Sequence, residues 1–210
     1  MLPVFGRSGD IPLDENAYEN TNLSLNMYMK ADSEEEMYSN RTRLMSLFDT
    51  GDYVNFIPYF DYDKTYSVMV VGSVTFTSHR KYRFNEIAEL ELTVKPFKYY
   101  NGNQHVMATN GGTIHNVYTN DSLPVIKLTG TGDSTISVNG KPFVIKNIQG
   151  YVIIDSQVQH AYREIETGLV NENSKIFTLD YPVLKKGSNK ISWTGNVSKV
   201  EIQPRWWTLI

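Results

Sequence analysis

The stretch 181–210 reads YPVLKKGSNKISWTGNVSKVEIQPRWWTLI, and it is the most informative part of the sequence for the fold. Apolar and polar residues alternate on both sides of Gly195-Asn196, and this period of two is typical of half-buried β-strands. Gly195-Asn196 can adopt the positive φ angles of a tight hairpin turn. Pro204 cannot donate a hydrogen bond to a strand ladder. We therefore expect two strands joined by a hairpin, ending at Pro204 and closing a β-sandwich.

The composition is that of a folded protein rich in β-structure. The chain has 210 residues, 12% aromatic residues, no cysteine and a net charge of −3. A chain of this length can bury a large core without disulfides, and the absence of cysteine excludes disulfides and thiolate zinc sites. Aromatic side chains suit both pleated sheets and contact surfaces.

The charge pattern and the apolar runs exclude two classes of partner. Lysine and arginine are scattered along a weakly acidic chain, which predicts no sequence-specific nucleic-acid binding. No apolar run approaches the roughly 20 residues of a membrane helix, so we expect no membrane insertion. The start, Met1-Leu-Pro-Val, lacks the basic and apolar segments of a signal peptide. We expect the chain to fold in the cytoplasm.

The first half predicts one helix among several strands. Residues 21–29 alternate leucine and methionine with polar residues, which indicates an amphipathic strand. Ser33-Glu-Glu-Glu36 forms a capping box, and we predict a helix over about 33–48 as the only substantial one in the chain. Further strands are predicted at 53–57, 66–72, 74–78 and 86–95.

Residues 97–104 are polar, aromatic and rich in turn formers without periodicity, so we place a domain boundary near residue 100. The domains are then 1–100 and 101–210. In the second, turn signals recur at the spacing of sandwiches and barrels, and Asn139-Gly140 predicts a hairpin. Residues 166–174 are polar and predict a mobile loop. Strands are predicted at 113–118, 124–129, 134–138, 143–148, 151–155 and 158–163.

No motif predicts catalysis, a metal site or a cofactor. The histidines lie far apart in the sequence, at His79, His105, His115 and His160. Asp61-x-Asp63 lacks the remainder of an EF-hand loop, and Asn110-Gly-Gly-Thr113 lacks the lysine and helix of a P-loop, so both are interpreted as turns. Glu89 and Glu91 are interpreted as an exposed acidic face rather than a glycosidase pair. Without a nucleophile elbow or a cysteine, we expect no enzyme.

Three residues near the end of the chain are the candidate contact residues: Arg205, Trp206 and Trp207. An exposed tryptophan can stack on a sugar ring or fill a pocket of a partner, whereas a buried one packs in the core. We favour core packing for Trp193 and leave both interpretations open for Trp206 and Trp207. Arg205, Trp206 and Trp207 are thus the candidate residues for contact with a partner or a glycan.

Short motifs recur along nearly the whole chain in a recognisable order. They are Gly6-Arg7-Ser8-Gly9, Tyr18-Glu-Asn20, 94–100, Gly111-Gly112, 123–132, Val138-Asn-Gly140, Ile153-Ile-Asp155 with Tyr162, 184–191 and 200–207. This order resembles that of the distal tail proteins, called Dit, of long-tailed siphophages and prophages of Gram-positive bacteria.

The resemblance implies a mainly β protein with two β-sandwich domains. The first carries a single α-helix and assembles into a homo-hexameric ring at the distal tail tip of the virion, and the second is a galectin-like jelly roll. The implied role is a structural baseplate hub that joins the major tail protein of the tube, the tail-associated fibre or lysin, and receptor-binding proteins. DNA passes through the ring without being read. Members usually carry a further strand or arm ahead of the Gly-Arg-x-Gly loop, so for a chain starting at Met1 we expect either impaired ring formation or a truncated or prophage copy.

A second hypothesis is a carbohydrate-binding module that recognises host cell-wall polysaccharide through the C-terminal domain. The His-x-Asn-x-Arg and Trp-x-x-Glu-x-Arg patterns by which galectins hold galactose do not occur, so sugar binding does not follow from the fold alone. Hydrolysis of glycan or peptidoglycan is the third hypothesis.

Overall fold

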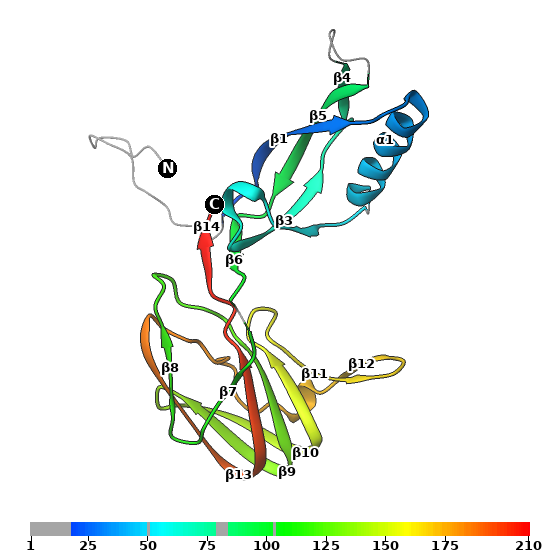
Figure 1. Ribbon diagram of the computed structural model, residues 1–210. Helices are drawn as coiled ribbons and strands as arrows, with labels where there is room; N and C mark the ends of the chain where they lie inside the picture. The colour runs from blue at the N-terminus through cyan, green and yellow to red at the C-terminus, as the bar shows by residue number, and fades with distance from the viewer. Residues whose placement is uncertain (1–17, 50, 79–83, 103) are drawn as a thin grey trace, which may run out of the picture. The chain divides into compact units, whose positions relative to one another are not determined.

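The structure is a computed structural model that describes residues 18–49, 51–78, 84–102 and 104–210 (Figure 1). Strand makes up 57% of the described residues, which also contain one α-helix, and this confirms the predicted fold class of two β-sandwich domains. One compact unit holds the described residues up to Phe56 together with Tyr66–Pro96 and Ile210, and the other holds Ile57–Thr65 and Phe97–Leu209. Whether separately folding domains meet near residue 100 stays a prediction. The Gly6-Arg7-Ser8-Gly9 loop and His79 lie outside the described residues.

The first unit is an antiparallel sheet with one helix. The central strand β5 (Asn85–Val94) pairs with β1 (Thr21–Lys30), with β3 (Lys64–Val70) and with β4 (Thr75–Ser78), while β2 (Val54–Phe56) pairs with β3. Ala88, Leu90, Leu92 and Val94 are all buried, and the residues between them lie toward the opposite face. The period of two thus places one face of β5 in the core, as the sequence predicts.

Helix α1 (Glu34–Phe48) begins where the capping motif predicts. The backbone N–H of Glu36 donates to Ser33 Oγ at 3.1 Å, and the Glu36 carboxylate accepts from the Asp32 N–H at 2.8 Å. The first contact satisfies a backbone donor that the first turn leaves unpaired, whereas the second pairs the N–H of the residue before the N-cap, one position earlier than in a standard capping box. Met37 and Leu44 are the buried side chains of the helix, and Leu44 joins the core of the sheet.

The second unit contains a seven-stranded sheet in the order β12-β11-β10-β9-β13-β7, with β8 also paired to β13. Its strands are β7 (Val106–Met107), β8 (Thr113–Asn116), β9 (Val125–Val138), β10 (Lys141–Asp155), β11 (His160–Ile165), β12 (Gly168–Asn171) and β13 (Gly187–Gln203). The strands β6 (Phe97–Tyr100) and β14 (Trp207–Leu209) form a further ladder. The unit also holds two short 3-10 turns, η1 (Tyr59–Asp61) and η2 (Asn173–Lys175).

The closing hairpin predicted around Gly195-Asn196 is wrong. β13 is one strand of 17 residues, and both of its halves pair with β9 rather than with each other. Gly195 does adopt a positive φ of 96°, but it lies in a β-bulge where the register with β9 shifts. A side chain there would place its Cβ 2.4 Å from the Asp133 carbonyl oxygen, so the close approach requires glycine. Pro204 ends the strand as predicted.

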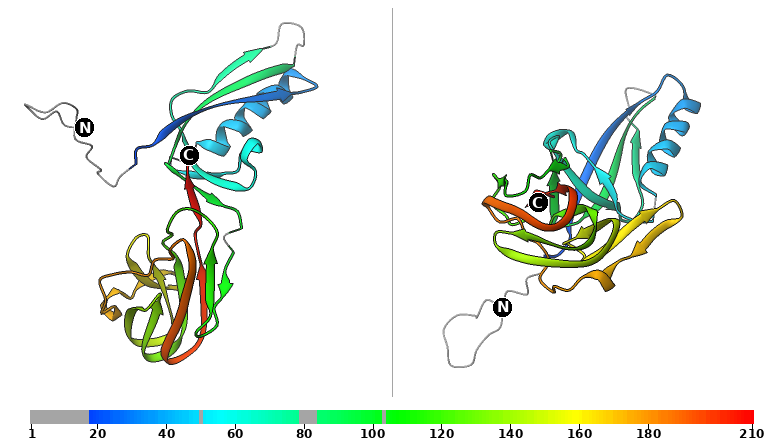
Figure 2. Two further views of the ribbon diagram at one scale, coloured as in Figure 1. Left: turned by 90° about the vertical axis from the view of Figure 1, so that its left-hand side faces the viewer. Right: turned by 90° about the horizontal axis from the view of Figure 1, so that it is seen from below.

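The predictions for β9 and β10 are wrong in the same way. The sequence predicts two short strands in each region, whereas the structure has one long strand. β9 passes through Gly130 and Gly132, and β10 passes through a register shift between Ile145 and Ile148. A straight strand of 14 residues would span roughly 45 Å, yet both ends of β9 contribute side chains to one core. The long strands therefore bend at their glycines and bulges, and Figure 2 shows β13 (orange to red) curving round at its middle.

Three other predictions for the second unit have different outcomes. The Asn139-Gly140 hairpin is confirmed, with φ angles of 53° and 79° and Val138 paired to Lys141. Residues 97–100 are strand β6 rather than an irregular boundary segment, because their aromatic side chains pack while their backbone pairs with β14. Part of the loop predicted at 166–174 is strand β12, and Glu172 is buried in ion pairs with Arg163 and Lys175.

Candidate interaction surface

Arg205 is positioned by the end of β13. After Gln203 the chain leaves the ladder at Pro204, whose carbonyl oxygen accepts a hydrogen bond from Ser122 Oγ. Arg205 then adopts a left-handed backbone with a φ of 56°. This conformation is uncommon for a residue with a side chain and needs support from its surroundings. Here the support comes from the contacts of the guanidinium group.

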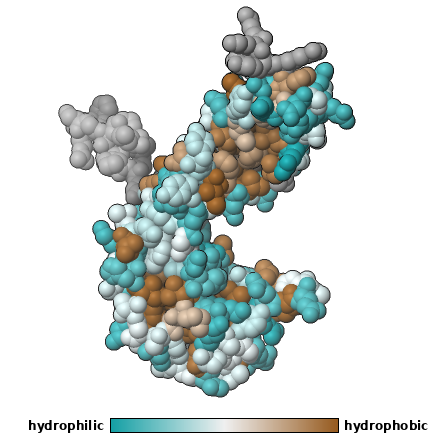
Figure 3. Space-filling view, viewed as in Figure 1, coloured by the Kyte–Doolittle hydropathy of each residue, from teal (hydrophilic) through white to brown (hydrophobic). Residues whose placement is uncertain are grey.

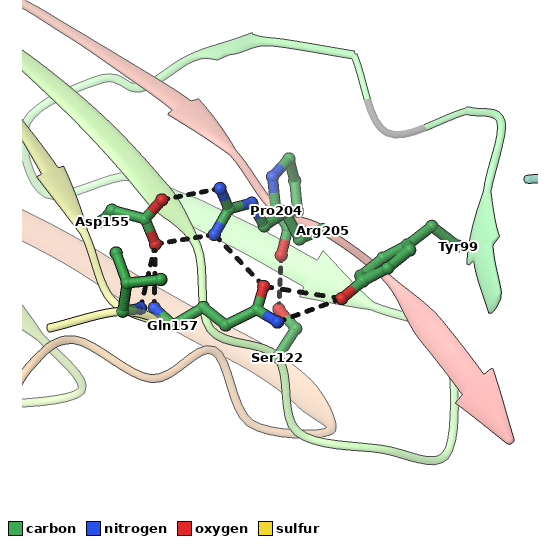
Figure 4. A network of polar contacts seen from close by, with 7 residues as sticks. Tyr99, Ser122, Asp155, Gln157, Pro204 and Arg205 are labelled. Carbon is green, nitrogen blue, oxygen red and sulfur yellow. Dashed lines mark hydrogen bonds and ion pairs between the residues drawn. The ribbon is translucent and has the colours of Figure 1, made fainter. Parts of the chain in front are cut away.

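The guanidinium of Arg205 binds Asp155 with two parallel hydrogen bonds, each 2.7 Å long (Figure 4). Asp155 lies at the end of β10 and also accepts the backbone N–H groups of Gln157 and Val158. Burial alone would raise the pKa of Asp155, but the hydrogen bonds and positive charge of Arg205, with the two N–H groups, outweigh it. The pKa of Asp155 is therefore lowered from its ordinary value.

Gln157 extends this polar network toward β6. Its side-chain oxygen lies 3.3 Å from Arg205 Nη1, and its Nε2 donates to the Tyr99 hydroxyl at 3.2 Å (Figure 4). A side chain held at both ends loses its rotamer freedom before any partner arrives. Arg205, Gln157 and Tyr99 therefore present a preorganised polar edge.

The two terminal tryptophans have different surroundings. Trp206 is 9% exposed and belongs to the core of the second unit, near the ring of Tyr118. Trp207 is half-buried, its Nε1 donates to the Asp121 carbonyl oxygen at 2.8 Å, and its ring lies edge-on to Phe97 at 4.6 Å between centroids. Trp193 is also half-buried against the core. Contact of Arg205, Trp206 or Trp207 with a partner or a glycan stays a prediction.

Two adjoining pockets flank these residues. A small one of about 130 Å³ is lined by Phe97, Tyr99, Arg205 and Trp207. A larger one of about 460 Å³ shares Asp121, Leu123 and Gln157 with it. The sequence analysis located Arg205 and Trp207 but missed Gln157 and Tyr99, which the fold brings to them from another turn and another strand. The Asp155-Ser-Gln157 turn after an apolar run was the available signal for Gln157.

The first unit has an apolar surface of its own. Around its core lie side chains that are only half-buried: Leu23, Met27, Met29, Phe48, Val54, Phe56, Val70, Val74 and Phe76. A groove of about 350 Å³ is lined by apolar residues including Met45, Phe48, Met69 and Val74. Figure 3 shows a broad apolar area on this unit. We call these half-buried residues and the groove the open face of the first unit.

The other acidic residues considered in the sequence form surface ion pairs or lie on an exposed strand face. Asp61 forms ion pairs with Lys64 and Lys98, each at 2.8 Å, and Asp63 also binds Lys64. Glu89 and Glu91 lie on the exposed face of β5, as predicted. Across the described ranges, no three histidine, aspartate or glutamate side chains gather as a possible metal site. In the same ranges no helix combines the length and apolar character needed to cross a bilayer.

Three solved structures that resemble this chain come from phages: one is a hub protein and two are of a baseplate. The Dit protein of phage SPP1, described as a paradigm of the hub of the adsorption apparatus in phages infecting Gram-positive bacteria, matches with a TM-score of 0.70 at 13% identity. The match covers 96% of this chain and 85% of that one. Two structures of the phage p2 baseplate in its activated conformation, with Sr and with Ca, match with TM-scores of 0.54 and 0.53 at 12% and 13% identity. Each covers 88% of this chain and 78% of the other.

No protein-family model matches the sequence, and no curated protein matches it significantly. The structural matches define the class as the fold of phage baseplate hubs. Within that class the chain has the fold of the SPP1 Dit protein, as the order of motifs predicts.

Proposed function

We propose that this protein is a structural hub of a phage tail tip and acts without catalysis. The observation that carries the proposal is the match to a Dit hub over 96% of the chain, which includes both units. A fold supports many functions, so the surfaces of this chain must also fit the role. A hub needs contact surfaces rather than a reaction centre, and the open face of the first unit is such a surface.

The proposed partner of the open face is another copy of the same chain. Contiguous exposed apolar surface on a protein marks a contact site. Met45 is 49% exposed beside the groove, and Phe48 and Val70 are only half-buried. Head-to-tail contacts between identical copies close into a ring when the rotation between neighbours permits it. The proposed assembly is a ring of six copies at the distal end of the virion tail.

The other proposed partners are the major tail protein of the tube, the tail-associated fibre or lysin, and receptor-binding proteins. The network of Arg205, Gln157 and Tyr99 supplies preorganised polar groups for such contacts. The net charge of −3 gives no attraction for the phosphate backbone, which fits a ring through which DNA passes unread. Glycan contact at Trp206 and Trp207 gains no specific support, because one ring is buried and the other packs on Phe97.

Light scattering on the purified full chain tests the ring. Six copies of the 24.0 kDa chain give about 144 kDa. Met45→Lys adds a charge to the open face at an exposed position, and we expect it to lower the measured mass toward that of one copy. The matched control is Leu169→Lys, because Leu169 is 66% exposed on β12 of the second unit. The control should keep the assembly.

A wild-type chain that stays at 24.0 kDa at high concentration would contradict the proposed self-assembly. Equal loss of mass in both variants would contradict the choice of the open face. Antibody labelling of virions at positions other than the tail tip would contradict the proposed location.

A further inference from the structure

Methionine is concentrated in the first unit. Within the described residues the second unit has only Met107. The first unit has five methionines in the same ranges: Met27, Met29, Met37, Met45 and Met69. All of these except Met37, which is buried, belong to the open face. Methionine is flexible and polarisable, so it is frequent on surfaces that adapt to another protein. Its sulfur is also a site of covalent modification.

Methionine is the side chain of this protein that peroxides oxidise most readily. The chain has no cysteine, so a peroxide finds no thiol that would react first. Hydrogen peroxide transfers one oxygen atom to the methionine sulfur: an S–O bond forms, the O–O bond breaks and water leaves. The sulfur loses two electrons and the peroxide gains them. The product is a sulfoxide, and no further reactant is needed.

Met45 is the most accessible methionine of the first unit among the described residues. It is 49% exposed, whereas the other four are half-buried or buried. Met45 lies three residues before Phe48 on α1, so the two side chains share one side of the helix, and both line the groove. Susceptibility to oxidation follows exposure, so a peroxide should reach Met45 before the other methionines of the open face.

A sulfoxide at Met45 changes what the groove can contact. Oxidation replaces a flexible apolar side chain by a polar one that carries an oxygen acceptor. The groove beside it is lined by the apolar side chains of Phe48, Met69, Val70 and Val74. In a contact between two copies the oxygen would lose its water and gain no donor from these side chains. A buried polar group without a partner is costly.

We infer that Met45 is an oxidation site for peroxides, and that its conversion to the sulfoxide blocks contact between the open face and a second copy, which rests on the ring proposed for this chain. The contact in turn shields Met45, because a sulfur removed from water is also removed from a dissolved oxidant. Assembly and oxidation of Met45 therefore oppose each other. Met107 on β7 provides the comparison, since it is 56% exposed and lies in the second unit.

The first experiment compares the two exposed methionines in one protein. The full chain is treated with hydrogen peroxide at protein concentrations below and above that at which light scattering detects assembly. Trypsin then releases the peptides 44–64 and 99–127, each with a single methionine, and mass spectrometry measures the added oxygen. Met45 and Met107 should oxidise at similar rates in the free chain, because their exposures are similar. In the assembled chain Met45 should oxidise several-fold more slowly, and Met107 at an unchanged rate.

The second experiment measures the mass of the assembly after oxidation. Oxidised wild type should need about tenfold more protein than untreated wild type to assemble, the effect of one buried polar group without a partner. Met45→Leu removes the sulfur and keeps an apolar side chain, so it should assemble equally well before and after peroxide. Met107→Leu is the matched control and should respond to peroxide as wild type does. Methionine sulfoxide reductases should restore the assembly of oxidised wild type.

Three results would overturn the inference. The first is an equal rate of Met45 oxidation in the free and the assembled chain, or equal protection of Met107. The second is oxidised wild type that assembles at the same protein concentration as untreated wild type. The third is Met45→Leu that still loses assembly after peroxide, which would assign the effect to another side chain. An untreated chain that never assembles would contradict the proposed ring as well, and light scattering shows this before any peroxide is added.

Discussion

The two units differ in how completely they bury their apolar side chains. Of the twelve largest fully buried side chains, ten belong to the second unit, and the first contributes only Leu90 and Leu92. Around a core of eight buried residues the first unit has nine half-buried apolar side chains, whereas the second has seven around a core of sixteen. A core whose apolar side chains are fully buried stabilises the isolated chain. Half-buried apolar side chains add further stability only when another surface removes them from water. In the proposed ring, the first unit is therefore the one that gains stability from a neighbouring copy.

Among the substitutions that test this difference between the units, Trp206→Ala in the second unit is expected to lower the free energy of unfolding most. Removing a ring that is 9% exposed within the core should cost about 3–5 kcal/mol in the free energy of unfolding. Trp207→Ala is the matched change, because Trp207 is only half-buried, and we expect a smaller loss. Urea unfolding followed by tryptophan fluorescence and circular dichroism measures both. Equal losses would show that Trp206 is not part of a tighter core than Trp207.

An intermediate effect is expected from Asp155→Asn, which removes the charge that Arg205 binds. Breaking such a pair leaves a guanidinium that is partly screened by solvent, so we expect a loss of about 2 kcal/mol, below the range for fully buried pairs. Asp155 has a lowered pKa in the folded state. Its contribution is therefore complete above the ordinary aspartate pKa of about 3.9 and is lost as the pH falls through the folded value.

Unfolding free energies measured from pH 7 down to pH 2 should accordingly converge for wild type and Asp155→Asn at the acidic end. The matched change in the first unit is Glu86→Gln, since Glu86 is buried, pairs with Arg41 and also has a lowered pKa, mainly through the Arg41 hydrogen bond. If the units unfold separately, each variant should shift only the transition of its own unit. A constant difference between wild type and Asp155→Asn across all pH values would contradict the assignment.

The smallest effect is expected from Ser33→Ala in the first unit. The change removes the side chain that caps α1 and should cost about 1 kcal/mol. Ser46→Ala is its control, because the Ser46 hydroxyl bonds within the same helix without capping it. If six-fold assembly stabilises the first unit, the unfolding free energies of wild type and Ser33→Ala should both rise with protein concentration while their difference stays constant. A loss in Ser46→Ala as large as in Ser33→Ala would argue against a capping role.

The elements that local sequence predicts correctly are those whose hydrophobic periodicity, capping residues or turn residues all indicate the same structure. β1, β5, the capped helix and the Asn139-Gly140 hairpin each combine a clear periodicity or turn motif with the observed element. The long strands could not be predicted because a glycine in the sequence can mark either a turn between strands or a bulge within one strand. At Gly140 it closes a turn, whereas at Gly195 it permits a bulge, and only the partner strand decides between them.

The candidate site could also be predicted only in part, because strand pairing decides which residues meet there. Arg205 and Trp207 stand out in the sequence, but Asp155 lies 50 residues before Arg205, and their pairing depends on how β10 and β13 align around β9. Local periodicity describes single strands, and it contains no information about which turns meet at one end of a sandwich.

The bends in β9, β10 and β13 have a mechanical consequence. In a sandwich whose layers are separate sheets, a pulling force can part the layers by separating two faces of side chains. Here three neighbouring strands run unbroken through their bends, and both halves of β9 and β13 supply side chains to one core. Force applied to one half is carried to the other by covalent backbone. Opening this unit therefore requires breaking the hydrogen-bonded ladders between β9 and its two neighbours.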